Sequence, residues 1–277
     1  MRALLALTLT LLIAAAQDSK LTVRETIRSP GFTAYQRADA LFVARKFPEC
    51  QAAIEEALRL DPKLVPALTL KAKLAMTIYR FDIARESLEK ALEADPSSAS
   101  AQFLYGLEAY LTNDLQSALP RFEKARQLNP ADPRGALYLG MTRESLGQPA
   151  DALKLYEEAV RLEQSAGTPQ ADTFLAGSRL LLLMGRLEDS KSWIERALKL
   201  EPNSRAAHFE YARFLQEKGD AIKAATEAEM ALRLTGGDPT DVQIHYLLIR
   251  AYRESERPAE VARHADAIRA LGSPKSK

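Results

Sequence analysis

The sequence predicts an all-α protein, a solenoid in which about seven helix-turn-helix units follow one another along the chain. Three observations lead to this fold class. Similar strings that end in proline recur 34 residues apart, and within each interval apolar residues recur at helical spacing. Turn-forming residues fall near the middle and the end of each interval. Two helices cannot bury their apolar faces alone, so we expect each unit to stack on its neighbours.

The first sixteen residues are expected to lie outside this fold. Arg2 supplies a positive charge, an uncharged and mostly apolar run follows from Ala3 to Ala16, and the run ends in three alanines. This pattern is typical of a cleavable secretory signal peptide, and fourteen residues of helix span about 21 Å, less than the roughly 30 Å of a bilayer core. A buried N-terminal helix and an uncleaved anchor are the alternatives. We therefore expect an exported protein, periplasmic or secreted after cleavage near Ala16/Gln17, with 17–30 as a lead or cap segment.

The period of 34 residues sets the register of the units. Ala-Leu-Arg-Leu-Asp-Pro ends at Pro62, and related strings end at Pro96, Pro130 and Pro202. Four inserted residues, 167–170, and three more, 239–241, bring the later units into line. The predicted units are 31–64, 65–98, 99–132, 133–166, 171–204, 205–238 and 242–275, which together form one solenoid over 31–275 with no second domain.

Small residues recur at the positions where two helices would approach closely. The 27th position of successive units is Ala57, Ala91, Ala125, Ala159, Ala197, Ala231 and Ile268, and the 20th is Cys50, Ala84, Ala118, Ala152, Ser190, Ala224 and Val261. The 15th position ends the first helix with Gly147, Gly185 and Gly219, and with Asn113, which suit a left-handed conformation. Arg45, Tyr79 and Glu256 depart from that pattern in the other three units.

One unit carries a recognisable signature. Gly140, Gly147, Ala152, Tyr156 and Ala159 match the signature of the tetratricopeptide repeat, and the chain resembles that family across 31–275. The resemblance implies a right-handed superhelix whose concave surface is lined by the first helix of each unit. The large aromatic residue usual at the fourth position is mostly absent, and the seventh unit fits least well, with a register that could slip by one residue.

The resemblance also implies which residues line the concave groove. The apolar candidates are Tyr35, Phe42, Met76, Phe103, Leu107, Tyr110, Met141, Phe209 and Tyr246. The basic candidates are Arg179, Arg213, Arg250 and Arg253. In one interpretation the aromatic side chains anchor a bound peptide and the arginines catch its acidic groups. In the other, the apolar residues pack against neighbouring helices and the arginines are solvated or paired to nearby glutamates.

Sequence signals for other kinds of chemistry are weak. The formal net charge of +1 disfavours a nucleic-acid binder that relies on bulk positive charge. His208 and His245 stand at the fourth position of successive units without acidic or cysteine residues at ligand spacing, so no metal and no cofactor are predicted. Cys50 falls at a small-residue position and is interpreted as a buried, inert thiol. No phosphate-binding loop, dinucleotide fingerprint or nucleophile elbow is present.

Three functions remain. The favoured hypothesis is an exported, non-catalytic scaffold or adaptor that binds a protein or peptide in the concave groove, with no membrane span in the mature chain. A component of an envelope assembly machine, of the kind used in pilus or outer-membrane biogenesis, is the alternative. Those proteins are usually lipid-anchored through a cysteine at the new N-terminus, and Gln17, not cysteine, directly follows the apolar run at 3–16. The third and least favoured hypothesis is an enzyme or a metal protein.

Overall fold

A computed structural model describes residues 29–272, and all of the regular structure in that range is α-helical. The described chain divides into two compact units, an N-terminal unit of residues 29–148 and a C-terminal unit of residues 149–272. The predicted signal peptide and nearly all of the lead segment 17–30 lie outside the described residues.

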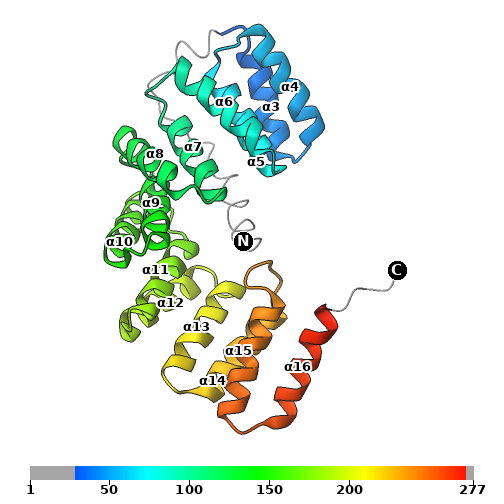
Figure 1. Ribbon diagram of the computed structural model, residues 1–277, viewed down its shortest axis with the longest axis vertical. Coiled ribbons are helices and arrows are strands. Elements are labelled where there is room, and N and C mark those ends of the chain that lie inside the picture. The colour runs from blue at the N-terminus through cyan, green and yellow to red at the C-terminus, as the bar shows by residue number, and fades with distance from the viewer. Residues whose placement is uncertain (1–28, 273–277) are drawn as a thin grey trace. The chain divides into compact units, whose positions relative to one another are not determined.

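The N-terminal unit contains seven helices. They are α3 (Phe32–Val43), α4 (Phe47–Leu60), α5 (Val65–Thr77), α6 (Phe81–Ala94), α7 (Ala99–Leu111), α8 (Leu115–Leu128) and α9 (Pro133–Ser145). Turns of three residues join α3 to α4, α5 to α6 and α7 to α8, and the two helices of each pair pack side by side (Figure 1). Ser98, Asp114 and Asp132 cap α7, α8 and α9 by accepting a backbone N–H of the first turn.

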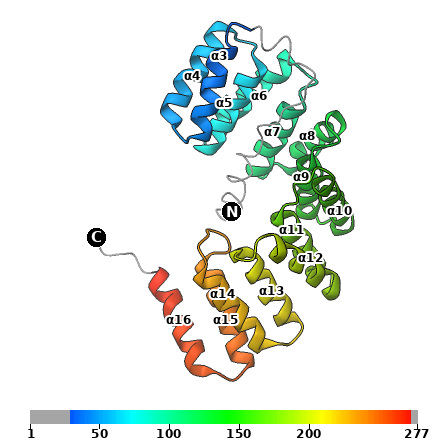
Figure 2. The same ribbon diagram turned by 180° about the vertical axis from the view of Figure 1, so that it is seen from behind.

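The C-terminal unit contains the other seven helices of the described chain. They are α10 (Pro149–Ser165), α11 (Ala171–Leu183), α12 (Leu187–Leu200), α13 (Arg205–Glu217), α14 (Ala221–Arg233), α15 (Asp241–Glu254) and α16 (Pro258–Gly272). In the reverse view, α13, α14, α15 and α16 again form neighbouring helix pairs (Figure 2). Thr240 begins α15 with a reciprocal capping box to Gln243.

Helix packing within each unit follows the order of the chain. The second helix of a pair contacts the first helix of the next pair, as α4 contacts α5 and α12 contacts α13. First helices also contact one another, as α3 contacts α5 and α11 contacts α13. This arrangement confirms the predicted all-α repeat solenoid. The last pair begins at Asp241, one residue before the expected boundary, where the capping residue Thr240 starts the helix.

The small residues lie where the helices meet. At the 27th position of the first six predicted units the alanine side chains are buried, and at the 20th position Cys50 and its equivalents are buried as well. Ile268 and Val261, the larger residues of the last unit, are only half-buried. Burial also raises the pKa of the Cys50 thiol to about 11, so this thiol is protonated at neutral pH and inert, as the sequence indicates.

A left-handed residue ends the first helix of every pair. Gly147, Gly185, Gly219 and Asn113 have positive φ angles, as predicted. Arg45, Tyr79 and Glu256 occupy the same position with φ between 57° and 61°. The helix-turn-helix geometry therefore imposes this conformation even where the local sequence offers neither glycine nor asparagine.

We predict that Arg45→Gly stabilises the protein by about 0.5–1 kcal/mol. A side chain in the left-handed region costs about 1–2 kcal/mol, and the greater freedom of glycine in the unfolded chain offsets part of the gain. Urea denaturation of the full chain measures the change. Arg45 is exposed, so Arg45→Ala, which keeps the Cβ, is the control and is expected to match the wild type. Equal stability of the glycine and alanine variants would contradict the prediction.

Candidate functional site

A small pocket lies on the face formed by the first helices α11 and α13 and by the segment that leads into α15. Its volume is about 130 Å³. It is lined by Asp172, Leu175 and Arg179 of α11, by Ala206, Phe209, Glu210 and Arg213 of α13, and by Asp238, Pro239 and Gln243. On both helices the lining residues are three or four positions apart, which places them on one side of the helix.

The pocket carries charges of both signs. Arg213 Nη1 donates to Glu210 Oε2 at 2.8 Å, and Glu210 is buried. Burial raises the pKa of the Glu210 carboxyl, an effect that Arg213 and Arg179 oppose. Burial likewise raises the pKa of Asp172 and of Asp238, and Arg179 opposes both shifts. The carboxylates are thus partly desolvated, and the arginines compensate only part of that cost.

Arg179 is a cation of this pocket whose guanidinium group is open, in the sense that no protein group within residues 29–272 is bound to it. Its charge acts on Asp172, Glu210 and Asp238, yet within residues 29–272 its side chain makes no hydrogen bond or close ion pair. Arg213, in contrast, is held by Glu210. A guanidinium group offers five N–H donors in a planar fork, so Arg179 can accept a carboxylate from a ligand without first breaking a contact to the protein.

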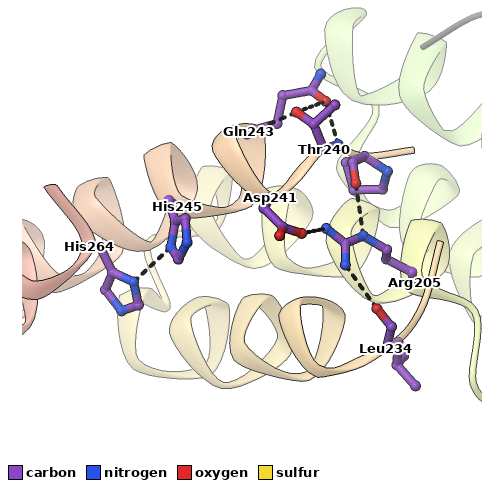
Figure 3. Close-up of polar contacts among 8 residues, drawn as sticks. Arg205, Leu234, Thr240, Asp241, Gln243, His245 and His264 are labelled. Carbon is purple, nitrogen blue, oxygen red and sulfur yellow. Dashed lines mark hydrogen bonds and ion pairs between the residues drawn. The ribbon is translucent and has the colours of Figure 1, made fainter. Parts of the chain in front are cut away.

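Arg205 fixes the segment that forms the far wall of the pocket (Figure 3). Its Nε donates to the carbonyl of Pro239 and its Nη1 to the carbonyl of Leu234, both at 2.8 Å, and its Nη2 pairs with the carboxylate of Asp241. The side chain is only 6% exposed. One buried arginine therefore holds both ends of the connection between α14 and α15, and places Asp238 and Pro239 against α13.

The pocket brings together three of the predicted groove residues, Arg179, Phe209 and Arg213. The other three in this unit lie outside it. Tyr246 is 60% exposed, and Arg253 is exposed as well. Arg250 donates to Glu217 and Glu254 at 3.0 and 3.2 Å, which is the pairing that the alternative interpretation predicts for the arginines. A binding role for these three residues stays a prediction.

The predicted groove residues of the N-terminal unit are mostly buried. Phe42, Met76, Phe103, Leu107 and Met141 are buried, whereas Tyr35 and Tyr110 are half-buried. Their burial is what the packing alternative predicts, and it leaves little of these side chains for a ligand to touch.

Aromatic contacts account for the burial of Phe103. Its ring lies 5.7 Å from the ring of Phe122 and 5.4 Å from that of Tyr138, and Tyr110 contacts Tyr138 in turn. Such pairs contribute about 0.5–1.5 kcal/mol each beyond the area that they bury. The aromatic residues around α7 therefore stabilise the N-terminal unit itself.

Comparison with known proteins identifies the family. The family model described as tetratricopeptide repeat matches residues 69–133, 106–171 and 175–239, which together make up more than half of the chain. The chain belongs to the tetratricopeptide repeat family. Members of this family are in general protein-interaction scaffolds, and the fold is typically non-catalytic. No curated protein sequence matches the chain.

Three solved tetratricopeptide-like structures illustrate the likeness. A chain of the APC/C hetero-tetramer Cut9–Hcn1 is 15% identical with a TM-score of 0.63; the match covers 94% of this protein and 52% of that chain, so this protein spans about half of its length. Pseudomonas aeruginosa pilF is 18% identical with a TM-score of 0.54, over 90% of this protein and 96% of that chain. YrrB, described as having an unusual peptide-binding site, is 20% identical with a TM-score of 0.52, over 68% of this protein and 94% of that chain. At these identities the likeness shows the fold alone.

Sequence reasoning missed four charged residues of this tetratricopeptide site, namely Asp172, Glu210, Asp238 and Arg205. Asp172 stands at the second position of its unit, which the family resemblance places on the inner surface, so this signal was available. Asp238 lies in the connection between α14 and α15 that Arg205 holds, and the repeat pattern gives no reason to expect either role. Glu210 follows the predicted Phe209 directly, and it is buried and paired with Arg213.

Neither a metal site nor a membrane span is found in the part of the chain that the structure describes. Across residues 29–272, no group of three or more histidine, cysteine, aspartate or glutamate side chains is placed to hold a metal ion. No helix in the same range combines the length and the hydrophobicity that crossing a bilayer requires. His208 is engaged by Glu227 at 2.7 Å and by the carbonyl of Pro202 at 3.0 Å.

Proposed function

We propose that the protein is an exported, non-catalytic scaffold that binds an extended segment of a partner protein at the pocket on α11 and α13. The observation that carries this proposal is Arg179, an open guanidinium group beside Phe209 in a hollow of the first-helix face. The family supports a protein-binding role, and the described peptide-binding site of YrrB is a precedent within the same fold.

The lining of the pocket suggests what the bound segment carries. A carboxylate of the ligand would take the donors of Arg179, and a charge-assisted hydrogen bond of this kind is worth about 1.5–3 kcal/mol. Phe209, which is half-buried, would cover an apolar side chain next to it, over a floor formed by the buried Leu175 and Pro239. Asp172 and Asp238 would accept N–H groups of the ligand. We therefore infer a segment that combines an acidic group with an apolar side chain and nearby donors, rather than a purely acidic one.

Export is the second part of the proposal, and it rests on the sequence of residues 1–16 alone. Cleavage near Ala16/Gln17 would place the mature protein in the periplasm or outside the cell. A role in an envelope assembly machine is the alternative, and the fold likeness to pilF is compatible with it. Osmotic shock of expressing cells, followed by N-terminal sequencing of the released protein, tests export. An unprocessed protein retained in the cytoplasm would overturn this part.

Peptide selection tests the binding proposal and gives its first quantitative prediction. Peptides selected from a display library against the full chain are measured by fluorescence anisotropy with the wild type, with Arg179→Gln and with Arg161→Gln. Arg161 is exposed on α10 and lines no part of the pocket, so its variant loses the same charge elsewhere. We expect Arg179→Gln to weaken binding at least tenfold, which corresponds to about 1.4 kcal/mol, and Arg161→Gln to leave it unchanged.

Two outcomes would overturn the site. Equal affinities for the wild type and Arg179→Gln would show that the selected peptides bind elsewhere. Failure to select any peptide with the folded full chain would remove the peptide-binding function itself. Thermal melts of the three proteins show whether a loss of affinity merely reflects a loss of folding.

A further inference from the structure

A second pocket, of about 380 Å³, lies in the C-terminal unit between α14 and α16, where residues of the α15–α16 turn complete it. It is lined by Ile222, Ala225, Thr226, Glu229, Arg233, Tyr252, Ser255, Arg257 and Arg263. None of these residues belongs to the pocket of the proposed function, which is built on the first helices. The second pocket is thus a separate surface, and three of its nine lining residues are arginines.

The one carboxylate of this pocket is already occupied. Glu229 Oε1 accepts from Arg263 Nη2 at 2.7 Å and from the hydroxyl of Tyr252 at 3.3 Å, and it lies 3.2 Å from Nε2 of His264. His264 is itself buried against His245. Glu229 and Arg263 therefore neutralise each other, and neither charge is left over for a ligand.

The other two arginines are uncompensated. Arg233 and Arg257 are exposed, and neither side chain has a hydrogen bond or ion pair to any residue between 29 and 272. The hydroxyls of Thr226 and Ser255 donate to carbonyls of their own helices, at 3.1 and 2.8 Å, so they supply no further donors. The side chains that line the pocket therefore have a net positive charge, which comes from Arg233 and Arg257.

The two arginines stand toward different ends of the pocket. Along α14 the lining extends from Ile222 to Arg233, and eleven residues of helix span about 16 Å. Ser255, two residues before Arg257, lines a neighbouring hollow together with Ile222, which places the α15–α16 turn at the Ile222 end. An extended chain covers this distance in about five residues, at about 3.3 Å each.

Apolar surface lies between and beside the charges. Ala225 and the ring of Tyr252 belong to the lining, and Ile222 is 62% exposed at one end. We propose that this pocket binds an extended acidic segment of a protein, about five residues long, with a carboxylate at each end and apolar side chains between them. Arg233 and Arg257 bind the carboxylates, and the exposed side chain of Ile222 covers the apolar side chains, while the buried Ala225 and Tyr252 form the floor below them. This segment is distinct from the one proposed for the pocket on α11 and α13.

A labelled peptide of sequence Glu-Leu-Gly-Leu-Glu, capped at both termini, is the probe, and its Gln-Leu-Gly-Leu-Gln counterpart is the uncharged comparison. Fluorescence anisotropy with the full chain at low salt measures both. We expect the acidic peptide to bind at least tenfold tighter than the amide peptide, with an affinity that falls as salt is added. Arg233→Gln combined with Arg257→Gln is expected to remove this difference.

A matched control separates the site from the general charge of the protein. Arg59→Gln combined with Arg161→Gln removes the same two charges from exposed positions outside the pocket and is expected to bind the acidic peptide like the wild type. Arg179→Gln is also expected to bind it normally, which distinguishes this site from that of the proposed function. The four arginines of the two double variants, at positions 59, 161, 233 and 257, are all exposed, and thermal melts verify that both double variants fold.

Several outcomes would overturn the proposal. They are equal binding of the amide peptide, an equal loss in the control variant, unchanged binding by the pocket variant, and no measurable binding of the acidic peptide by the wild type. Binding to phosphatidylserine vesicles that depends on Arg233 and Arg257, without binding to the peptide, would assign the surface to a membrane instead.

Discussion

Replacing Ala125 by tryptophan is expected to destabilise the protein by about 3 kcal/mol, close to the upper end of the usual cost of overpacking a core. Ala125 is buried in α8 at the position where every one of the first six units carries alanine. The two helices approach closely at the next residue, since a Cβ added to Gly135 of α9 would lie 3.2 Å from the Cβ of Arg126. An indole ring at position 125 therefore has to push α8 away from its neighbours.

Chemical denaturation of the full chain, followed by circular dichroism, measures this effect. Gln116→Trp introduces the same side chain into the same helix at an exposed position and is expected to change stability by less than about 0.5 kcal/mol. A wild-type denaturation curve for Ala125→Trp would mean that the 27th position does not lie at a tight helix contact. That result would contradict the register on which the repeat assignment depends.

Ala125 shows why so much of this fold could be predicted from the sequence. A repeat of 34 residues applies the same packing requirement at the same position several times, so a single alanine becomes informative through its equivalents at 57, 91, 159, 197 and 231. The turns show the same effect at residues whose type disfavours the conformation that their position requires. Arg45, Tyr79 and Glu256 adopt the left-handed conformation because their position in the unit requires it, although their residue types argue against it.

The candidate site was predictable only in part, because periodicity fixes the face of a helix and not the partner of a side chain. The repeat placed Arg179, Phe209 and Arg213 on one face, and the pocket does bring these three together. It gave no reason for Arg250 to be held by Glu217 and Glu254, or for Arg179 to be left open. Those differences arise from acidic residues on neighbouring turns and helices, whose positions do not repeat.

The repeat pattern does not predict the contacts of Arg205, and removing this side chain has the second large effect that we predict. Arg205→Ala is expected to cost about 2–4 kcal/mol of stability. The substitution leaves the carbonyls of the buried Pro239 and the half-buried Leu234 without these donors, and a polar group left unsatisfied in a buried position costs about 1–3 kcal/mol. Asp241 also loses its partner, but it is half exposed, so water compensates much of that loss.

Two comparison variants make the interpretation specific. Arg186→Ala breaks an exposed arginine–aspartate pair at the start of α12 and is expected to have little effect on stability, which shows that the loss of a charge pair alone is not the cause. Arg205→Lys restores one donor group where three bonds are needed, so an intermediate stability is expected. Stability of Arg205→Ala equal to that of Arg186→Ala would contradict the anchoring role.

The same substitution connects the inserted loop to binding. Asp238 and Pro239 reach the pocket on α11 and α13 because Arg205 holds the chain on both sides of them. At a temperature where Arg205→Ala is still folded, we expect it to bind the selected peptides several-fold more weakly, although Arg179 and Phe209 are unchanged, because a mobile wall must be ordered when the peptide binds. Anisotropy titrations below the melting transition measure this loss. Full affinity in the folded variant would mean that the peptide contacts only α11 and α13, and that the insertion at 239–241 contributes to stability alone.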